Sequence, residues 1–240
     1  MIIDRIAKQR VNVIMLIDTS TSMRGKRIDQ VKKALVDIKK KLIDMEDVNI
    51  NADYYLTLIT FSSEAKYLNN SKMDRISDVD LSNLKVGGWS NLHLALVKLE
   101  DLLKKESKGG IMPDFGGIAP IIVLLTDGHP TGNGYKAELA KLKKLPWFNV
   151  ALRYGIAIEL NDKRTVQVLR EFVGDNGDVI ECYDSKMLER IIRIIVITAS
   201  KVKSETANVS IGKDIGKNSI NTVAQLEITE NLAETEDWEW

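Results

Sequence analysis

The stretch Val11-Asn12-Val13-Ile14-Met15-Leu16-Ile17-Asp18-Thr19-Ser20-Thr21-Ser22 decides the fold. Its first seven residues are apolar apart from Asn12, and such a run is typical of a strand buried on both faces, as in a parallel sheet. The change to polar residues at Asp18 marks the end of that strand. We therefore expect polar side chains to gather at the carboxyl edge of a sheet.

The remainder of the chain alternates between predicted strands and predicted helices. Apolar runs predict further strands at residues 54–61, 121–125, 150–158 and 179–182. Apolar residues that recur every three or four positions predict helices at about 28–42, 91–103, 135–145, 162–173 and 185–203. This alternation predicts an α/β fold with a doubly wound, mostly parallel sheet flanked by helices. Residues 107–117, which are polar and rich in glycine, are expected to form an exposed insertion.

Composition narrows the function. The 240 residues carry 34 basic and 34 acidic side chains, and zero net charge argues against a nucleic-acid or membrane-surface binder. Apolar runs such as 121–125 and 194–197 are much shorter than the ~20 residues that span a bilayer. A single cysteine, Cys182, excludes an internal disulfide framework. Charged residues near the amino terminus do not fit a signal peptide, so we expect a cytoplasmic protein.

The carboxyl-terminal part of the chain differs in charge. Residues 201–240 hold 4 basic and 8 acidic side chains, with six acids and no base from Glu227 onward. We expect one domain at residues 1–203 and an acidic extension at 204–240 that is partly disordered or docked. Thr229 and Thr235 lie among these acids, a setting that some kinases accept in a substrate.

Oxygen-bearing side chains follow two of the predicted strands and precede one helix. Asp18, Ser20 and Ser22 occupy alternate positions of a loop, where they can converge on one point. Ser90 precedes the predicted helix at 91–103, and Asp127 follows the strand at 121–125. These are hard ligands that suit Mg²⁺, Mn²⁺ or Ca²⁺ and suit zinc poorly. Taken without Ser90 and Asp127, the first loop would be equally consistent with a helix cap.

Three segments together carry a family resemblance: 18–22 (Asp-Thr-Ser-Thr-Ser), 87–90 (Gly-Gly-Trp-Ser) and 125–128 (Leu-Thr-Asp-Gly). They resemble the metal-ion-dependent adhesion site of von Willebrand factor A domains. The resemblance implies that hydroxyls bind the metal, that the two aspartates act directly or through water, and that an Asp or Glu of a protein partner completes the coordination. In that family a threonine normally follows the paired glycines directly. Here Trp89 intervenes and Ser90 takes the role.

Residues 18–23, 61–65 and 125–131 are more closely similar to the bacterial, cytoplasmic tellurium-resistance-associated members of that family. This likeness implies an adaptor in a stress-resistance or defence system that works beside a protein kinase and a metal-dependent phosphatase.

Several side chains next to the predicted site are candidates for partner binding. Trp89 is either an exposed contact or a packed residue, and His129 is either a neighbour of the metal or part of a His-Pro turn. The bases Arg24, Lys26 and Arg27 either solvate the start of a helix or add positive field that steers acidic partners.

The residue pattern favours binding over catalysis, because no general base with an obvious role lies near the site in the sequence. The alternative is a Mg²⁺-dependent phosphatase of the haloacid dehalogenase type, which also has an apolar strand that ends in aspartate. That chemistry needs a second acid where this chain has Ser20. It also needs later paired acids, whereas Asp127 is followed by Gly128 and His129.

Overall fold

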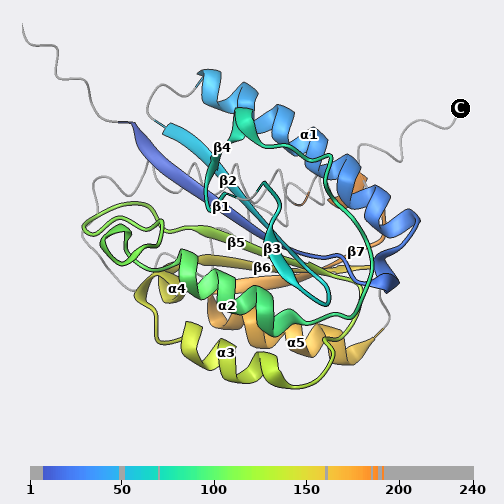
Figure 1. Cartoon of the computed structure of the whole chain (residues 1–240). Coiled ribbons are helices and arrows are strands. Elements are labelled where there is room, and N and C mark those ends of the chain that lie inside the picture. Colours follow the sequence, from blue (N-terminus) through green and yellow to red (C-terminus); the bar gives the residue numbers. More distant parts are fainter. Residues whose placement is uncertain are drawn as a thin grey trace, which may run out of the picture.

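The structure is a computed structural model that describes residues 8–48, 52–69, 71–159, 162–184, 186–188 and 191 (Figure 1). The acidic extension predicted at 204–240 lies outside the described residues. So does most of the helix predicted at 185–203, of which only 186–188 and 191 are described, as helix. None of the helices described is both long enough and apolar enough to span a bilayer.

A mostly parallel sheet forms the centre of the molecule. Five strands are parallel: β1 (Gln9–Asp18), β2 (Ala52–Phe61), β5 (Ile121–Thr126), β6 (Leu152–Ile158) and β7 (Gly177–Cys182). Two short strands, β3 (Ala65–Tyr67) and β4 (Asp74–Arg75), pair with β2 in the antiparallel sense. The order is β3-β2-β1-β5-β6-β7. This arrangement confirms the predicted fold class.

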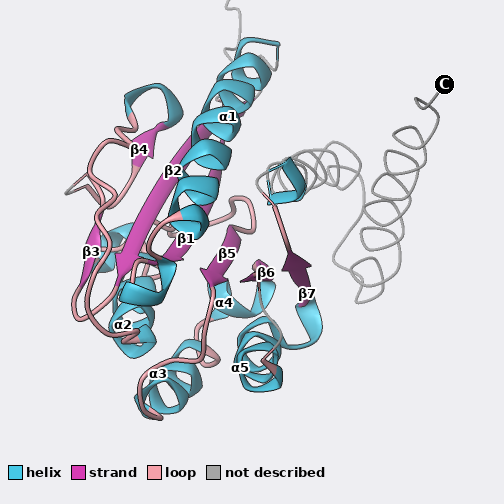
Figure 2. Cartoon of the chain, turned by 90° about the vertical axis from the view of Figure 1, so that its right-hand side faces the viewer, coloured by secondary structure: helices cyan, strands magenta, loops and turns pink. Residues whose placement is uncertain are grey.

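Helices cover both faces of the sheet (Figures 1 and 2). One face carries α1 (Lys26–Val48), and the other carries α2 (Leu92–Leu102), α3 (Gly134–Leu142), α4 (Pro146–Val150) and α5 (Lys163–Val173). Within the described residues, short 3₁₀ helices lie at Thr21–Met23, Ile76–Asp78, Glu106–Lys108 and Gly174–Asn176.

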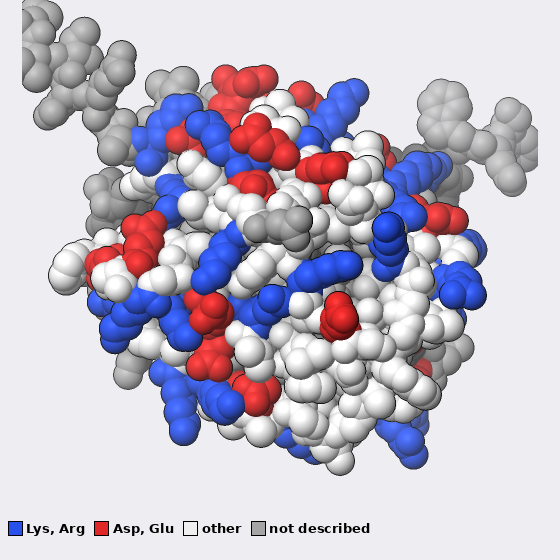
Figure 3. Space-filling view, in the orientation of Figure 1, with Lys and Arg blue, Asp and Glu red and all other residues white. Residues whose placement is uncertain are grey.

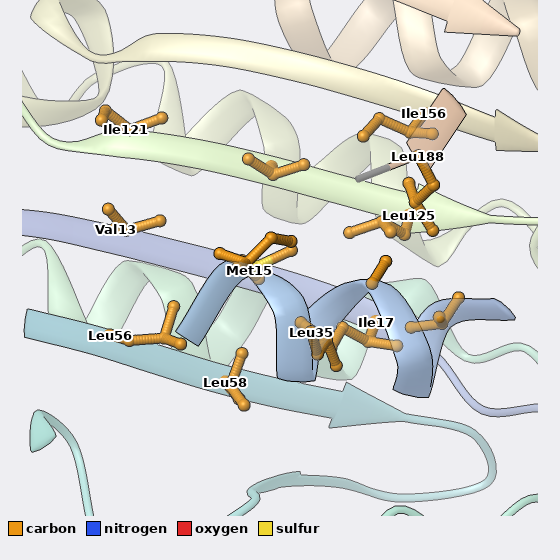
Figure 4. Packing of buried hydrophobic residues seen from close by; sticks show 14 of the residues in the cluster. Val13, Met15, Ile17, Leu35, Leu56, Leu58, Ile121, Leu125, Ile156 and Leu188 are labelled. Atoms are coloured by element: carbon orange, nitrogen blue, oxygen red, sulfur yellow. The ribbon is translucent and has the colours of Figure 1, made fainter. Parts of the chain in front are cut away.

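The alternation of side chains along β1 explains the two cores. Met15 and Ile17 face α1 and pack with Leu35, as Figure 4 shows. Ile14 and Leu16 point to the opposite face, where the core includes the apolar side chains of α2 and α5. Because both faces of β1 are covered, its polar end at Asp18 is the first place where the strand can present side chains to a ligand.

The structure corrects two local expectations. The predicted helix at 135–145 ends at Leu142, and Pro146 opens the short helix α4, so that β6 starts at Leu152. Proline fits the first turn of a helix, because its φ is already helical and the N–H it lacks would have no partner there. The short edge strands β3 and β4 were not predicted, since two or three residues carry too little periodicity.

The loop at residues 107–117 is not wholly exposed, contrary to expectation. Ile111 and Met112 are buried. The backbone N–H of Ile111 donates to the carbonyl oxygen of Leu102 at 2.9 Å, and that of Glu106 donates to the carbonyl oxygen of Met112 at 2.7 Å. These contacts anchor the loop to the end of α2.

The order of the strands determines where a site can form. After β1 the chain adds β2 on one side, and it later returns to add β5 on the other side of β1. In doubly wound sheets such a switch opens a crevice at the carboxyl ends of the two strands. Asp18 ends β1 and Thr126 ends β5, so the predicted site lies at the switch point.

Candidate metal-ion site

The fully buried carboxylate of Asp18 is the centre of the site. Its Oδ1 accepts the backbone N–H of Ser20 at 2.8 Å. Its Oδ2 accepts the hydroxyl of Ser90 at 2.8 Å and the hydroxyl of Thr126 at 2.8 Å. Burial raises the pKa of Asp18 above its ordinary value, and these hydrogen bonds act in the opposite direction.

A second chain of contacts connects the remaining predicted residues. The Oγ atoms of Ser20 and Ser22 are 3.0 Å apart, and the Ser22 hydroxyl donates to Asp127 Oδ1 at 2.8 Å. Asp18, Ser20, Ser22, Ser90 and Asp127 thus meet in one cluster at the ends of β1 and β5 and the start of α2. The structure brings together the side chains that the sequence placed in three separate segments.

Backbone hydrogen bonds fix the loops that carry these side chains. The backbone N–H of Thr21 donates to the carbonyl oxygen of Gly88 at 3.0 Å, and that of Gly87 donates to the carbonyl oxygen of Thr19 at 2.9 Å. The N–H of Thr131 donates to the carbonyl oxygen of Ser90 at 2.7 Å. The three loops therefore hold one another at fixed distances.

The inserted Trp89 does not prevent Ser90 from reaching Asp18. Gly88 adopts a φ of +85°, a left-handed conformation that turns the chain between the glycines and Ser90. The N–H of Trp89 then donates to the Ser63 hydroxyl at 3.1 Å. Trp89 is 69% exposed beside the site, which rules out the packed alternative for this residue.

Two residues of the cluster were not predicted as site residues. Thr126 lies within the segment 125–128 but was given no role of its own, yet its hydroxyl donates to Asp18. Arg27 was considered only as a source of positive field, yet its Nη1 donates to Asp127 Oδ2 at 2.7 Å. The signal for Thr126 was present in the sequence, because a polar residue ends an otherwise apolar strand. The Arg27 contact depends on the tertiary fold.

The other predicted partner contacts lie further from the cluster. His129 is exposed, and its Nδ1 is 3.5 Å from Asp162 Oδ2 at the start of α5. Arg24 is exposed at the end of the first 3₁₀ helix. On the face shown in Figure 3, basic and acidic side chains are interspersed.

The residues present suit a hard divalent cation. Within the described part of the chain, no group of three or more His, Cys, Asp or Glu side chains could hold a metal ion. An ion at this cluster would therefore depend on the hydroxyls of Ser20, Ser22 and Ser90. Neutral oxygens with one or two carboxylates match the preference of Mg²⁺ or Ca²⁺ and lack the nitrogen or sulfur that zinc favours.

The fold and the hydroxyl-rich cluster define a doubly wound α/β domain with a candidate cation site at its switch point. The sequence profile of the von Willebrand factor type A domain matches residues 12–214, and the chain belongs to this family.

Relatives of known sequence share about half of this chain. Inter-alpha-trypsin inhibitor heavy chain 4 of Mus musculus is 33% identical over 126 residues, which cover 50% of this chain and 12% of that protein. This chain therefore spans only a small part of the length of such relatives.

Solved structures share the fold. The pilus adhesin SpaC of Lactobacillus rhamnosus GG, in its open conformation, superposes with a TM-score of 0.59 at 15% identity, covering 83% of this chain and 31% of the adhesin. Proximal thread matrix protein 1 of the mussel byssus superposes with a TM-score of 0.55 at 20% identity, covering 81% and 48%. That matrix protein is described with a zinc-occupied metal-ion-dependent adhesion site.

Proposed function

We propose that this protein is a metal-dependent protein-interaction module and not an enzyme. Ser20, Ser22 and Ser90 would hold Mg²⁺, with Mn²⁺ or Ca²⁺ as alternatives, and the two aspartates Asp18 and Asp127 would tune it directly or through water. The single observation that carries the proposal is the convergence of these five side chains on one cluster at the switch point.

When bound, the cation supplies a Lewis-acidic centre that attracts an anionic oxygen. The chain's own residues hold the hydroxyls in place and supply at most the two negative charges of Asp18 and Asp127. A partner that presents Asp or Glu would then complete the shell. Trp89 offers exposed apolar area beside that point, and Arg24 and His129 lie on the surrounding loops.

We further propose a cytoplasmic adaptor of a bacterial stress-resistance or defence system, with a protein kinase and a metal-dependent phosphatase as partners. Support comes from the likeness of residues 18–23, 61–65 and 125–131 to the tellurium-resistance-associated proteins. The relative described above is a mammalian inhibitor heavy chain, so the proposed relation to the bacterial proteins rests on those motifs alone. We retain the division into a domain at 1–203 and an acidic extension at 204–240.

The arrangement around Ser20 argues against phosphatase chemistry of the haloacid dehalogenase type. The position that would need a second acid holds a hydroxyl, and that hydroxyl lies 3.0 Å from Ser22 Oγ. In that mechanism the second acid protonates the leaving oxygen, and a serine hydroxyl cannot take over this role of a carboxyl group.

Thermal unfolding with Mg²⁺, Mn²⁺ or Ca²⁺ tests the metal proposal. A cation that binds only the folded state at 100 times its Kd stabilises it by about 2.7 kcal/mol. We expect stabilisation of the wild type and of Asp29→Asn, which removes an exposed carboxylate on α1, and none of Asp18→Asn. Equal behaviour of all three proteins would refute the site.

A further inference from the structure

We infer that Arg27 is a resident counterion of Asp127 that lowers the affinity of the site for its cation and raises the affinity of the loaded site for an acidic partner segment. This inference rests on the proposed metal-dependent binding. It adds a specificity-determining residue that acts through charge and is not one of the three hydroxyl ligands.

Asp127 is paired directly with Arg27 inside the site. Its side chain is fully buried, and each carboxylate oxygen has one donor. Oδ1 accepts the Ser22 hydroxyl at 2.8 Å, and Oδ2 accepts Arg27 Nη1 at 2.7 Å. The oxygen that faces Arg27 is therefore engaged by a guanidinium, and Asp127 connects to the hydroxyl cluster through Ser22.

Arg27 is itself held in place by several contacts. The same Nη1 donates to the carbonyl oxygen of Ser22 at 3.2 Å, while Nε is 3.5 Å from Glu159 Oε2. Glu159 follows β6 with a φ of +49°, which is rare for a residue with a side chain. It also binds Lys26 at 2.8 Å and Gln30 at 3.2 Å. Arg27 is thus held between the ends of β5 and β6 and cannot swing freely into solvent.

The guanidinium of Arg27 is accessible from solvent. The Arg27 side chain is 33% exposed although Asp127 is fully buried. The positive charge therefore lies at the rim of the site, where an approaching partner meets it. Because Nη1 and Nε already contact Asp127 and Glu159, Arg27 would act on an incoming carboxylate mainly through its charge.

Charge counting gives the direction of both effects. A divalent cation with two ionised aspartates, Asp18 and Asp127, is neutral, and Arg27 makes the loaded site positive by one charge. Like charges repel the incoming cation, whereas the surplus positive charge attracts an anionic ligand. A single substitution at Arg27 should therefore move cation affinity and anion affinity in opposite directions. Loss of structure would weaken both.

The test uses Arg27→Met, which keeps an unbranched apolar stem and removes the charge. Mn²⁺ affinity is measured by calorimetry, and the Mn²⁺-saturated protein is then titrated with a peptide of alternating Glu and Gly or with its Gln counterpart. We expect Arg27→Met to bind Mn²⁺ at least about threefold more tightly and the Glu peptide at least about threefold more weakly. The matched control is Lys33→Met, an exposed base further along α1, for which we expect changes below about twofold.

A second variant should change both affinities in the directions opposite to those expected for Arg27→Met. Glu159→Gln removes the anion that shares Arg27, so the guanidinium charge is less neutralised. We expect weaker Mn²⁺ binding and tighter binding of the Glu peptide than in the wild type.

The outcomes separate the two proposals. If Mn²⁺ binds the wild type but not Asp18→Asn, while Arg27→Met changes neither affinity or weakens both, the role of Arg27 is wrong and the metal site stands. If Mn²⁺ binds the wild type and Asp18→Asn alike, or neither of them, both proposals fall.

Discussion

The carboxylate of Asp18 accepts the hydroxyl of Ser90 at 2.8 Å, across 72 positions of the chain. The contact joins the end of β1 to the residue two positions before α2 and closes the cluster on the side where Trp89 is inserted. Because Asp18 is fully buried, every donor to its carboxylate bears on both stability and cation binding.

Replacing Ser90 with alanine should destabilise the protein by about 1 to 2 kcal/mol, because a buried carboxylate loses one donor. The same change should weaken Mn²⁺ binding, since one proposed ligand disappears. Urea unfolding in chelator measures the first effect and calorimetry the second. Ser90→Thr retains the hydroxyl and serves as the control. A Ser90→Ala protein with wild-type Mn²⁺ affinity would remove Ser90 from the ligand set.

Thr126→Val should lower stability by about 1 kcal/mol at nearly constant volume, because its hydroxyl donates to Asp18 at 2.8 Å and the strand around it is buried. Thr126→Ser should restore most of the loss. Chemical denaturation of the three proteins in chelator makes the comparison. Equal stability of the valine and serine variants would mean that this hydrogen bond contributes nothing net.

Much of the fold could be predicted from the sequence because its signals are local. The apolar run before Asp18 and the stripe of α1 each lie within one element, and strands that alternate with helices leave few topologies. Contacts between loops that are distant in the sequence were harder to predict. The Arg27–Asp127 pair joins residues 100 positions apart, and Glu159, from a third segment, holds it in place.

The position of the Ser90 hydroxyl next to Trp89 was also hard to predict from the sequence. The sequence offered a hydroxyl one position later than the family pattern. The left-handed turn at Gly88 and the hydrogen bond from Trp89 to Ser63 explain how that hydroxyl still reaches Asp18. The hydrogen bond depends on the approach of the loop after β2 to the segment that contains Trp89, and no local sequence pattern indicates that approach. α4 was missed for a different reason, because Pro146 was interpreted as the end of the preceding helix, whereas that helix ends at Leu142 and Pro146 begins a new one.

The start of α5 should make stability depend on acid pH. Asp162 Oδ1 accepts the N–H of Arg164 at 3.1 Å, and Oδ2 accepts the N–H of Thr165 at 3.3 Å. The bond from Arg164 is the main reason why the pKa of Asp162 lies below its ordinary value. The ionised form is thus favoured in the folded state. Its stabilising effect is complete above the unfolded pKa of about 3.9 and is lost as pH falls through the lower folded value.

Asp162→Asn isolates that effect, because asparagine also caps helices but carries no charge. The wild type should be more stable than the variant at pH 7, and the difference should shrink toward acid pH. Thermal unfolding from pH 7 to pH 2.5 in chelator measures it, with Asp37→Asn, in the middle of α1, as the carboxylate control. A difference that stays constant with pH would contradict the role of the charge.

Gly88→Ala tests whether the left-handed turn positions Ser90. A Cβ at residue 88 would lie 2.4 Å from Ser63 Oγ and 3.1 Å from the Ser63 backbone nitrogen, and the φ of +85° disfavours any side chain. We expect a loss of about 1 to 3 kcal/mol and weaker Mn²⁺ binding, because relief of the clash moves Ser90 away from Asp18.

Gly87→Ala is the matched control, since a Cβ there meets no atom within 4 Å, and its stability should stay within about 0.5 kcal/mol of the wild type. Urea unfolding and Mn²⁺ calorimetry of both variants complete the comparison. Combining Gly88→Ala with Ser63→Gly removes the Oγ contact but leaves the backbone strain, so only part of the loss should return. Wild-type Mn²⁺ affinity in Gly88→Ala would mean that Ser90 reaches Asp18 without this turn, and the inserted Trp89 would then need a different explanation.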